Sequence, residues 1–393
     1  MKFLKSIFAT ALAFSVTAAS ASGLTISNGQ YMHNGYAFNG VGVNYFNAFY
    51  RYAMNGNDTS WKAGLATLHG YNVPFIRINT LGFWPTDLRA DYFNNKTVFY
   101  QRLDAFMQEA ANQNIGVVMD VFWNWSAFAD LNGEHMQAWG DASSKTRQTM
   151  RAVTTEIVSR YKNHPALWGW EFANESASLM DLPNGNHQWL PVSGSQGTPS
   201  PRTAVDDFTV ATILSAQADF AATVRALDPD TPIFSGNSAP RYDAWHLQTG
   251  SWTADTVTQF GLILSRDNPA PAQAAAVNTL GLHLYPSYVS QYFGSASTTL
   301  ADLLSATMTQ SHKDGRPVFL GEFGVSDQDF PGAAGQTKFA ELTQAILVNR
   351  VPMSALWVFD LTQQNGSWNT TATNSRAWQL DSVRNMNAIM KTW

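Results

Sequence analysis

The chain has 393 residues, no cysteine, and a formal net charge of −5. The lack of cysteine excludes a disulfide framework and a cysteine-based metal site. The acidic balance argues against nucleic acid or an anionic membrane as a partner, because both bind basic protein faces. Hydrophobic residues make up 45% of the chain and charged residues only 13%, so we expect a globular protein with a large core.

The N-terminus has the residue order of a secretory signal peptide. Lys2 and Lys5 precede an apolar stretch over residues 7–19, and the small residues Ala19-Ser20-Ala21 follow. The sequence therefore predicts a signal peptide at residues 1–21 and a secreted protein, extracellular or periplasmic. Later apolar runs are shorter than the roughly 20 residues that a membrane helix needs. We expect residues 22–393 to form a single domain that is monomeric.

Two turn signals follow the signal peptide. Asn28-Gly29 and Asn34-Gly35 each separate short runs of strand-forming residues, which is the pattern of two-residue hairpin turns. We expect a short N-terminal β-hairpin in this region.

The rest of the chain alternates between strand and helix patterns. Strands are predicted at residues 40–45, 73–79, 116–122, 167–172, 232–235, 280–284, 318–321 and 355–359. Helices are predicted at residues 98–114, 145–162, 205–227, 300–313, 336–349 and 376–391. Such alternation predicts an α/β fold, a (β/α)₈ TIM barrel whose floor the hairpin closes. Segments 181–202 and 239–272 are interpreted as long loops on the catalytic face.

Polar and aromatic side chains gather where these strands end. Because the carboxyl ends of all strands in such a barrel meet on one face, residues far apart in sequence come together there. Glu175 follows the fourth strand and Glu322 ends the seventh. A pair of carboxyl groups is what cleavage of a glycosidic bond requires. Either glutamate, taken alone, also fits a surface or salt-bridged residue.

The ordered set of motifs resembles glycoside hydrolase family 5 of clan A, the retaining family of cellulases and mannanases. The resemblance covers nearly the whole chain after residue 21. It rests on five motifs in chain order: Phe-Ile-Arg77-Ile-Asn, Trp-Glu-Phe-Ala-Asn174-Glu175, His283-Leu-Tyr285-Pro, Gly-Glu322-Phe-Gly and Ala-Leu-Trp357.

The resemblance implies different roles for the two glutamates. Glu175 would be the general acid and base, and Glu322 the nucleophile that forms a covalent glycosyl intermediate. In a retaining pair the carboxyl groups stand about 5 to 5.5 Å apart, so Glu322 must be ionised while Glu175 holds a proton. Arg77 would orient Glu322 and keep its pKa low, and Tyr285 would donate to the same carboxylate.

The remaining implied roles concern substrate contacts. Asn174 would bind the sugar 2-hydroxyl, His283 the acid or the substrate, and Trp357 would form the floor under the attacked sugar. These roles require neither a metal nor a cofactor. For each of these residues, packing or a structural hydrogen bond is the alternative. Trp125, like Trp123 and the pair Phe83-Trp84, fits either a sugar-stacking position or a buried core position.

One segment departs from the cellulase pattern of the family. Many cellulases carry a histidine at the end of the third strand, where this chain reads Asp120-Val-Phe-Trp-Asn-Trp125. Asp120 itself is interpreted as a structural partner of Arg77. We therefore expect an endo-acting hydrolase of internal β-1,4 bonds in a neutral polysaccharide, mannan or glucan, with the mannanase branch favoured. The alternatives are an exo-acting glycosidase or transglycosylase and a non-catalytic carbohydrate-binding protein.

Overall fold

The computed structural model describes residues 23–82, 88–179, 200–207, 209–269, 277–287 and 289–393. Three predicted features lie outside or mostly outside these ranges: the signal peptide at residues 1–21, the pair Phe83-Trp84, and the loop at residues 181–202. Within the described ranges, no helix combines the length and apolar character required to cross a lipid bilayer.

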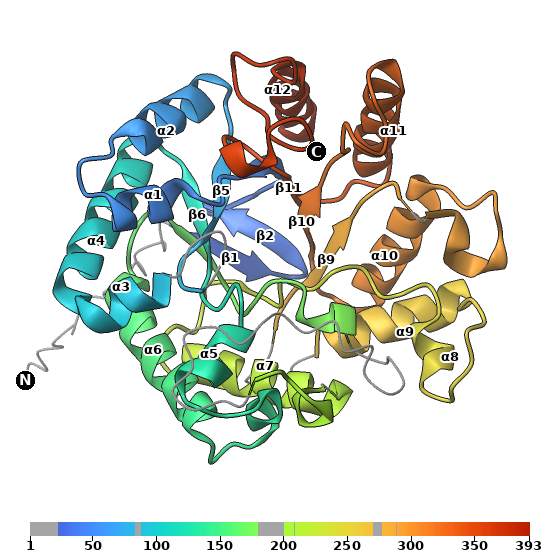
Figure 1. The fold of residues 1–393 in the computed structure, drawn as a ribbon. Helices are drawn as coiled ribbons and strands as arrows, with labels where there is room; N and C mark the ends of the chain where they lie inside the picture. The colour runs from blue at the N-terminus through green and yellow to red at the C-terminus, as the bar shows by residue number, and fades with distance from the viewer. Residues whose placement is uncertain (1–22, 83–87, 180–199, 208, 270–276, 288) are drawn as a thin grey trace, which may run out of the picture.

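Eight parallel strands form the centre of the molecule, and helices surround them (Figure 1). The strands are β4 (Gly40–Asn44), β5 (Phe75–Asn79), β6 (Gly116–Asp120), β7 (Leu167–Glu171), β8 (Ile233–Phe234), β9 (Leu280–Leu284), β10 (Val318–Phe323) and β11 (Met353–Leu356). They are paired in the order β8-β7-β6-β5-β4-β11-β10-β9. The predicted (β/α)₈ barrel is confirmed, although its last strand begins two residues earlier than expected.

Side chains join the two ends of this sheet. Within the part of the chain that the structure covers, no backbone ladder connects β8 to β9. Instead, the Ile233 N–H donates to Asn278 Oδ1 at 2.8 Å, and Thr279 Oγ1 donates to the Ile233 carbonyl at 2.9 Å. The Asn268 amide also bonds both the N–H and the C=O of Gly281. These bonds satisfy buried backbone groups that a strand would otherwise pair.

The helices follow the strands in chain order. They are α1 (Ala48–Met54), α2 (Ser60–Gly70), α3 (Leu88–Asn94), α4 (Lys96–Asn112), α5 (Ser126–Leu131), α6 (Lys145–Tyr161), α7 (Val210–Arg225), α8 (Ala244–Leu247), α9 (Val257–Asp267), α10 (Leu300–Asp314), α11 (Ala333–Val348) and α12 (Trp378–Met390). Short 3₁₀ helices occupy Met136–Gly140, Ser176–Leu179, Ala204–Asp206, Val289–Gly294 and Thr362–Gln364.

The prediction of a long loop at residues 239–272 was wrong. This segment contains α8 and α9, and α9 is the helix that follows β8 in the barrel. Thr256 and Gln259 form a capping box at its start, and Phe260, Ile263 and Leu264 lie on its buried face. The capping box and the spacing of the apolar residues are both visible in the sequence, but the nearby Gly, Pro and Ser residues favour a loop.

A three-stranded antiparallel sheet covers the floor of the barrel. It consists of β1 (Leu24–Ser27), β2 (Gln30–His33) and β3 (Tyr36–Ala37). Both central residues of each turn have positive φ, 51° and 73° at Asn28-Gly29 and 51° and 81° at Asn34-Gly35, as a type I′ turn requires. The predicted hairpin is therefore confirmed. Its side chains complete an apolar cluster of Leu24, Tyr31, Phe75, Val118, Trp168, Phe234, Phe319, Met353 and Ala355.

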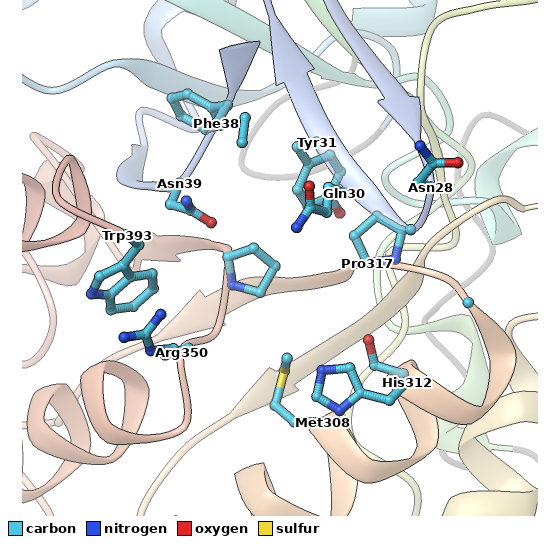
Figure 2. Close-up of a pocket in the computed structure, with 15 residues that line it drawn as sticks. Asn28, Gln30, Tyr31, Phe38, Asn39, Met308, His312, Pro317, Arg350 and Trp393 are labelled. Atoms are coloured by element: carbon cyan, nitrogen blue, oxygen red, sulfur yellow. The ribbon is translucent and has the colours of Figure 1, made fainter.

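A cavity of about 330 Å³ lies beside this sheet, and we call it the floor cavity. Figure 2 shows Gln30 of β2, with Phe38 and Asn39 from the segment after β3, on one side and His312 of α10 on another. Trp393, at the end of the chain, borders the cavity with Arg350, whose guanidinium lies 5.7 Å from the Trp393 ring centre. The floor cavity opens at the amino ends of the strands, away from the carboxyl ends where the predicted site lies.

Candidate active site

Arg77 occupies the centre of the barrel at the carboxyl end of β5, and it is completely buried. Its guanidinium contacts the neighbouring strands on both sides. Nη1 donates to Glu322 Oε1 at 2.8 Å and to Asn44 Oδ1 at 3.0 Å. On the other edge, Nε and Nη2 donate to Glu171, while Nη2 also donates to Asn174 Oδ1 at 2.8 Å and to Asp120 Oδ2 at 3.3 Å. The predicted contact with Asp120 is thus present.

Register breaks in two strands aim the acidic side chains at Arg77. Along β7, Val117 pairs with Leu167 but Val118 pairs with Gly169, so Trp168 is an extra residue. Along β10, Leu320 pairs with Leu282 but Glu322 pairs with His283, so Gly321 is extra. An extra residue reverses which face the following side chains occupy. As a result, Trp168 and Phe319 belong to the floor cluster. Glu171 and Glu322, each three residues later on the same strand, face Arg77.

Glu322 is held by two strong donors. Its side chain is 5% exposed, Arg77 Nη1 donates to one oxygen, and the Tyr285 hydroxyl donates to the other at 2.5 Å. Burial raises the pKa of Glu322, while His283, Arg77 and the Tyr285 hydrogen bond act to lower it. The expectation that Arg77 keeps this pKa below its ordinary value was wrong, because desolvation outweighs the guanidinium charge.

Glu175 has a different environment. Its backbone has φ of 50°, in the left-handed region that non-glycine residues rarely adopt, and its N–H donates to the Gly236 carbonyl at 2.7 Å. The side chain is 37% exposed, and partial burial of the carboxyl group raises its pKa while Arg77 acts to lower it. Its Oε1 lies 3.0 Å from His283 Nδ1.

His283 connects the two glutamates. Its Nδ1 lies 3.0 Å from Glu175 Oε1 and 3.6 Å from Glu322 Oε1. Its Nε2 is buried beside Gly321 and has no hydrogen-bond partner among the described residues. Burial lowers the pKa of His283 to about 4, so the ring is neutral at neutral pH. The geometry assigns its single proton to Nδ1, because a proton on Nε2 would be buried without an acceptor.

The same three residues bring one atom each within 4.8 Å of one another: a carboxylate oxygen of Glu175, a carboxylate oxygen of Glu322, and a nitrogen of His283. Such a group has the spacing of a metal-ligand set. However, His283 presents an N–H at Nδ1, and Glu322 already accepts from Arg77 and Tyr285. The arrangement is therefore better suited to proton transfer and nucleophilic attack than to metal binding.

An aromatic cluster adjoins the carboxyl groups. Phe46, Trp123 and Trp357 pack together, with Tyr285 and Trp368 against them. The Trp123 and Trp357 rings are stacked with centres 5.9 Å apart, and Trp357 Nε1 donates to Gln364 Oε1 at 2.9 Å. Trp123 also covers Arg77, whose guanidinium carbon is 4.6 Å from its ring centre.

The structure thus brings together seven of the eight predicted site residues, namely Arg77, Asn174, Glu175, His283, Tyr285, Glu322 and Trp357. Trp125 differs, because it belongs to the main hydrophobic core and contacts Trp139, whose Nε1 donates to the Trp125 carbonyl. Of the two predictions for Trp125, a sugar-stacking position or a buried core position, the core position therefore describes it better.

Sequence reasoning overlooked Glu171, Asn44 and Gln364. Glu171 appears inside the motif that contains Asn174 and Glu175, but strict strand alternation does not indicate its direction, since the register break reverses it. Asn44 ends the first barrel strand, and its residue type alone does not indicate that its amide oxygen accepts from Arg77. Gln364 ends the short 3₁₀ helix Thr362–Gln364 after β11, and no sequence signal connects it to Trp357.

Comparison with known proteins places this geometry in context. A family model described as cellulase (glycosyl hydrolase family 5) matches residues 32–379. A probable mannan endo-1,4-beta-mannosidase A-2 of Aspergillus terreus is 34% identical over 97 residues, which cover 23% of this chain and 24% of that protein. Mannan endo-1,4-beta-mannosidase F of Aspergillus fumigatus is 29% identical over 82 residues, 19% of this chain and 18% of that protein. The chain thus matches about a quarter or less of these relatives' lengths.

Solved structures resemble the whole fold. An endo-1,4-beta-mannanase from Rhizomucor miehei superposes with a TM-score of 0.66 at 15% identity, covering 94% of this chain and 100% of that one. The catalytic domain of an endoglucanase from Thermobifida fusca gives a TM-score of 0.57 at 14% identity, covering 93% and 98%. At these identities the likeness concerns the barrel fold.

Proposed function

Because the chain belongs to the cellulase family, glycosyl hydrolase family 5, we propose that it is a secreted, retaining hydrolase of internal β-1,4 bonds in mannan. The observation that supports this most directly is the pair Glu175 and Glu322. They stand at one mouth of the barrel with carboxylate oxygens within 4.8 Å of each other and have unlike hydrogen-bond partners. That spacing is close to the about 5 to 5.5 Å of retaining pairs and well below the about 6.5 to 9.5 Å of inverting pairs, which favours the retaining reaction.

The proposed first step forms a glycosyl enzyme. A Glu322 oxygen attacks the anomeric carbon, the bond from that carbon to the glycosidic oxygen breaks, and Glu175 gives its proton to the departing oxygen. Arg77 and Tyr285 donate to Glu322, which favours its ionised form and holds it in position, whereas among the described residues His283 is the one close donor to Glu175. The two carboxyl groups therefore have different protonation states before reaction.

In the second step, Glu175 is the base. It takes a proton from a water molecule, the water oxygen bonds to the anomeric carbon, and the ester bond to Glu322 breaks. When Glu175 is ionised, the His283 Nδ1–H donates a hydrogen bond to it and thereby stabilises the carboxylate that exists between the two steps. The NH₂ group of Asn174 is available to a sugar hydroxyl, because its oxygen accepts from Arg77.

Mannan is the favoured substrate for two reasons. The curated relatives that match this chain are named as mannan endo-1,4-beta-mannosidases, and the third barrel strand lacks the histidine of many cellulases. The aromatic cluster around Trp357 and the net negative charge of the chain suit a neutral polysaccharide. Secretion is proposed from the charged, apolar and small-residue order of residues 1–21.

Product analysis tests this function. The purified protein is incubated separately with galactomannan, carboxymethyl cellulose, xylan and mixed-linkage glucan, and product lengths are followed from the first minutes. We expect mixed mannooligosaccharides early, with the β-anomer formed first in nuclear magnetic resonance spectra. A single small product throughout would indicate exo action, initial α-anomer would exclude retention, and binding without products would indicate a carbohydrate-binding protein.

A further inference from the structure

Glu171 makes the closest set of contacts to Arg77 in the site. Both of its oxygens accept from Arg77 Nε at 2.9 Å, and Oε1 also accepts from Nη2 at 2.6 Å. Both side chains are completely buried. Glu171 therefore binds one edge of the guanidinium through charge-assisted hydrogen bonds. The proposed roles of Glu175 and Glu322 do not assign a function to Glu171.

The same guanidinium also contacts the reacting groups. Nη1 donates to Glu322, and Nη2 donates to Asn174, the residue before Glu175. Because the guanidinium is planar and rigid, fixing the Nε and Nη2 edge also fixes the direction of Nη1. A displaced Glu171 would thus change the position of the hydrogen bond that Glu322 receives.

Gly236 leaves the space that the Glu171 carboxylate occupies. A Cβ atom on Gly236 would lie 2.4 Å from Glu171 Oε1 and 1.9 Å from the Ala173 carbonyl oxygen. Its φ of 73° also favours glycine. Since the carbonyl of Gly236 accepts from the Glu175 N–H, one backbone turn contacts both glutamates of β7 and its following loop.

Asp120 completes the charge balance. Three buried carboxyl groups, those of Asp120, Glu171 and Glu322, surround one guanidinium. Burial and then the neighbouring Glu171 charge raise the pKa of Asp120 well above its ordinary value, so the charged form of Asp120 is disfavoured. Arg77 makes its shorter carboxylate contacts to Glu171 on one side and to Glu322 on the other.

We propose that Glu171 is a positioning residue of the reaction, which acts by aiming Nη1 of Arg77 at the Glu322 carboxylate. This inference rests on the proposed function. It assigns Glu171 no contact with the substrate, so its loss should affect kcat more than KM.

The test uses Glu171→Asp in the full-length protein, since this variant keeps the charge but shortens the side chain by one methylene group. We expect kcat/KM on galactomannan to fall about 100-fold, because the guanidinium is displaced, while KM changes less than about threefold. The acid limb of the pH profile of kcat/KM should move up by about one pH unit, because Glu322 loses part of a charge-assisted bond. The charged or titratable groups that face Glu322 are Arg77, Asp120, Glu175, His283 and Tyr285.

A double-mutant cycle separates action through Arg77 from any other role. In an Arg77→Lys background the planar fork is absent, so Glu171→Asp should cost less than about threefold further. A matched control is Asp314→Asn, which weakens a partly buried pair with Arg316 just before β10, at the floor end of the strand that carries Glu322. The control should lower stability and leave the acid limb unchanged.

The outcomes are distinguishable. If the parent protein hydrolyses none of the polysaccharides, the proposed function fails. If the parent is active but Glu171→Asp keeps its kcat/KM, or its loss is fully additive with Arg77→Lys, the positioning role is wrong. Should Glu171→Asp not fold, Glu171→Gln replaces it. If Arg77 is displaced, the pKa of Glu322 rises and the acid limb of the pH profile moves to higher pH. If only a negative charge is lost, the pKa of Glu322 falls, the acid limb moves to lower pH, and the proposal is contradicted.

Discussion

The two ends of the barrel are built from the same strands but contain opposite kinds of side chain. On β5, Phe75 joins the apolar floor cluster, whereas Arg77, two residues further, binds six carboxyl or amide oxygens at the other end. The floor holds Trp168 and Phe319, and the mouth holds Glu171 and Glu322. The floor is therefore stabilised by packing, while the mouth concentrates buried charge at some cost in stability.

Substitutions at the two ends should therefore affect activity and stability differently. Changes at the mouth should act mainly on activity, because the charges there are desolvated for catalysis. Changes at the floor should lower stability and leave turnover unchanged, because the floor cluster contacts no reacting group. The following experiments test that separation.

Removal of the nucleophile should have the largest effect. Glu322→Ala should lower kcat on galactomannan by on the order of 10⁴-fold or more, because no other described carboxylate stands in position to attack. Steady-state kinetics measure this, and circular dichroism checks the fold. Glu341→Ala, an exposed glutamate on α11, is the control and should keep full activity. Substantial turnover by Glu322→Ala would show that the nucleophile is another residue.

Removal of the acid should cost less. Glu175→Ala should lower kcat on galactomannan about 10²- to 10⁴-fold, the usual contribution of general acid catalysis. Its loss should be smaller on an aryl glycoside whose leaving group needs no proton, and added azide should then restore turnover by attacking the glycosyl enzyme. The rate is measured with and without azide. If azide has no effect on that substrate, Glu175 is not the acid and base.

The floor should respond in the opposite way. Trp168→Ala should destabilise the fold by about 3 to 5 kcal/mol, because Trp168 is 4% exposed and packs against Phe38, His33 and Phe75. Denaturant unfolding measures the loss, and kcat at 25 °C should stay within about twofold of the parent. A parallel fall in kcat of the folded protein would show that the floor and the mouth are coupled.

Two tyrosines offer a matched comparison. Tyr285→Phe removes a hydrogen bond to ionised Glu322 and should lower kcat by roughly 10- to 100-fold. Tyr31→Phe removes a buried hydroxyl that has no hydrogen-bond partner among the described residues, so kcat should not change and stability should stay equal or rise slightly. The separation of the two ends is wrong if Tyr31→Phe lowers kcat as far as Tyr285→Phe.

The smallest effect concerns stability and pH at Glu175. Because the pKa of Glu175 is raised in the folded protein, the fold binds this proton more tightly than the unfolded chain does, and ionisation costs stability as pH rises through and above the ordinary carboxyl range. Glutamine cannot ionise, so Glu175→Gln should raise the Tm by roughly 1 to 2 °C near pH 7 and leave it unchanged near pH 3. Calorimetry at both values checks the sign, and a lower Tm at pH 7 would contradict it.

Strand alternation predicted the barrel well but not the direction of every acidic side chain. The eight strands and the hairpin turns could be predicted because buried parallel strands form short apolar runs and Asn-Gly favours positive φ. The helix α9 was missed because turn-forming residues surround its capping box. Glu171 was missed because an extra residue in β7 reverses the face of everything after it.

The sequence by itself determined the order of the elements and the kinds of side chain at the strand ends, since both follow from local pattern. Which carboxyl groups contact Arg77, and how its hydrogen bonds are divided among them, depends on the tertiary structure alone. Those contacts join β5, β6, β7 and β10 across the barrel, and the register between strands sets them. The pKa of Glu322 is likewise a tertiary property, because the burial that raises it depends on the closed barrel.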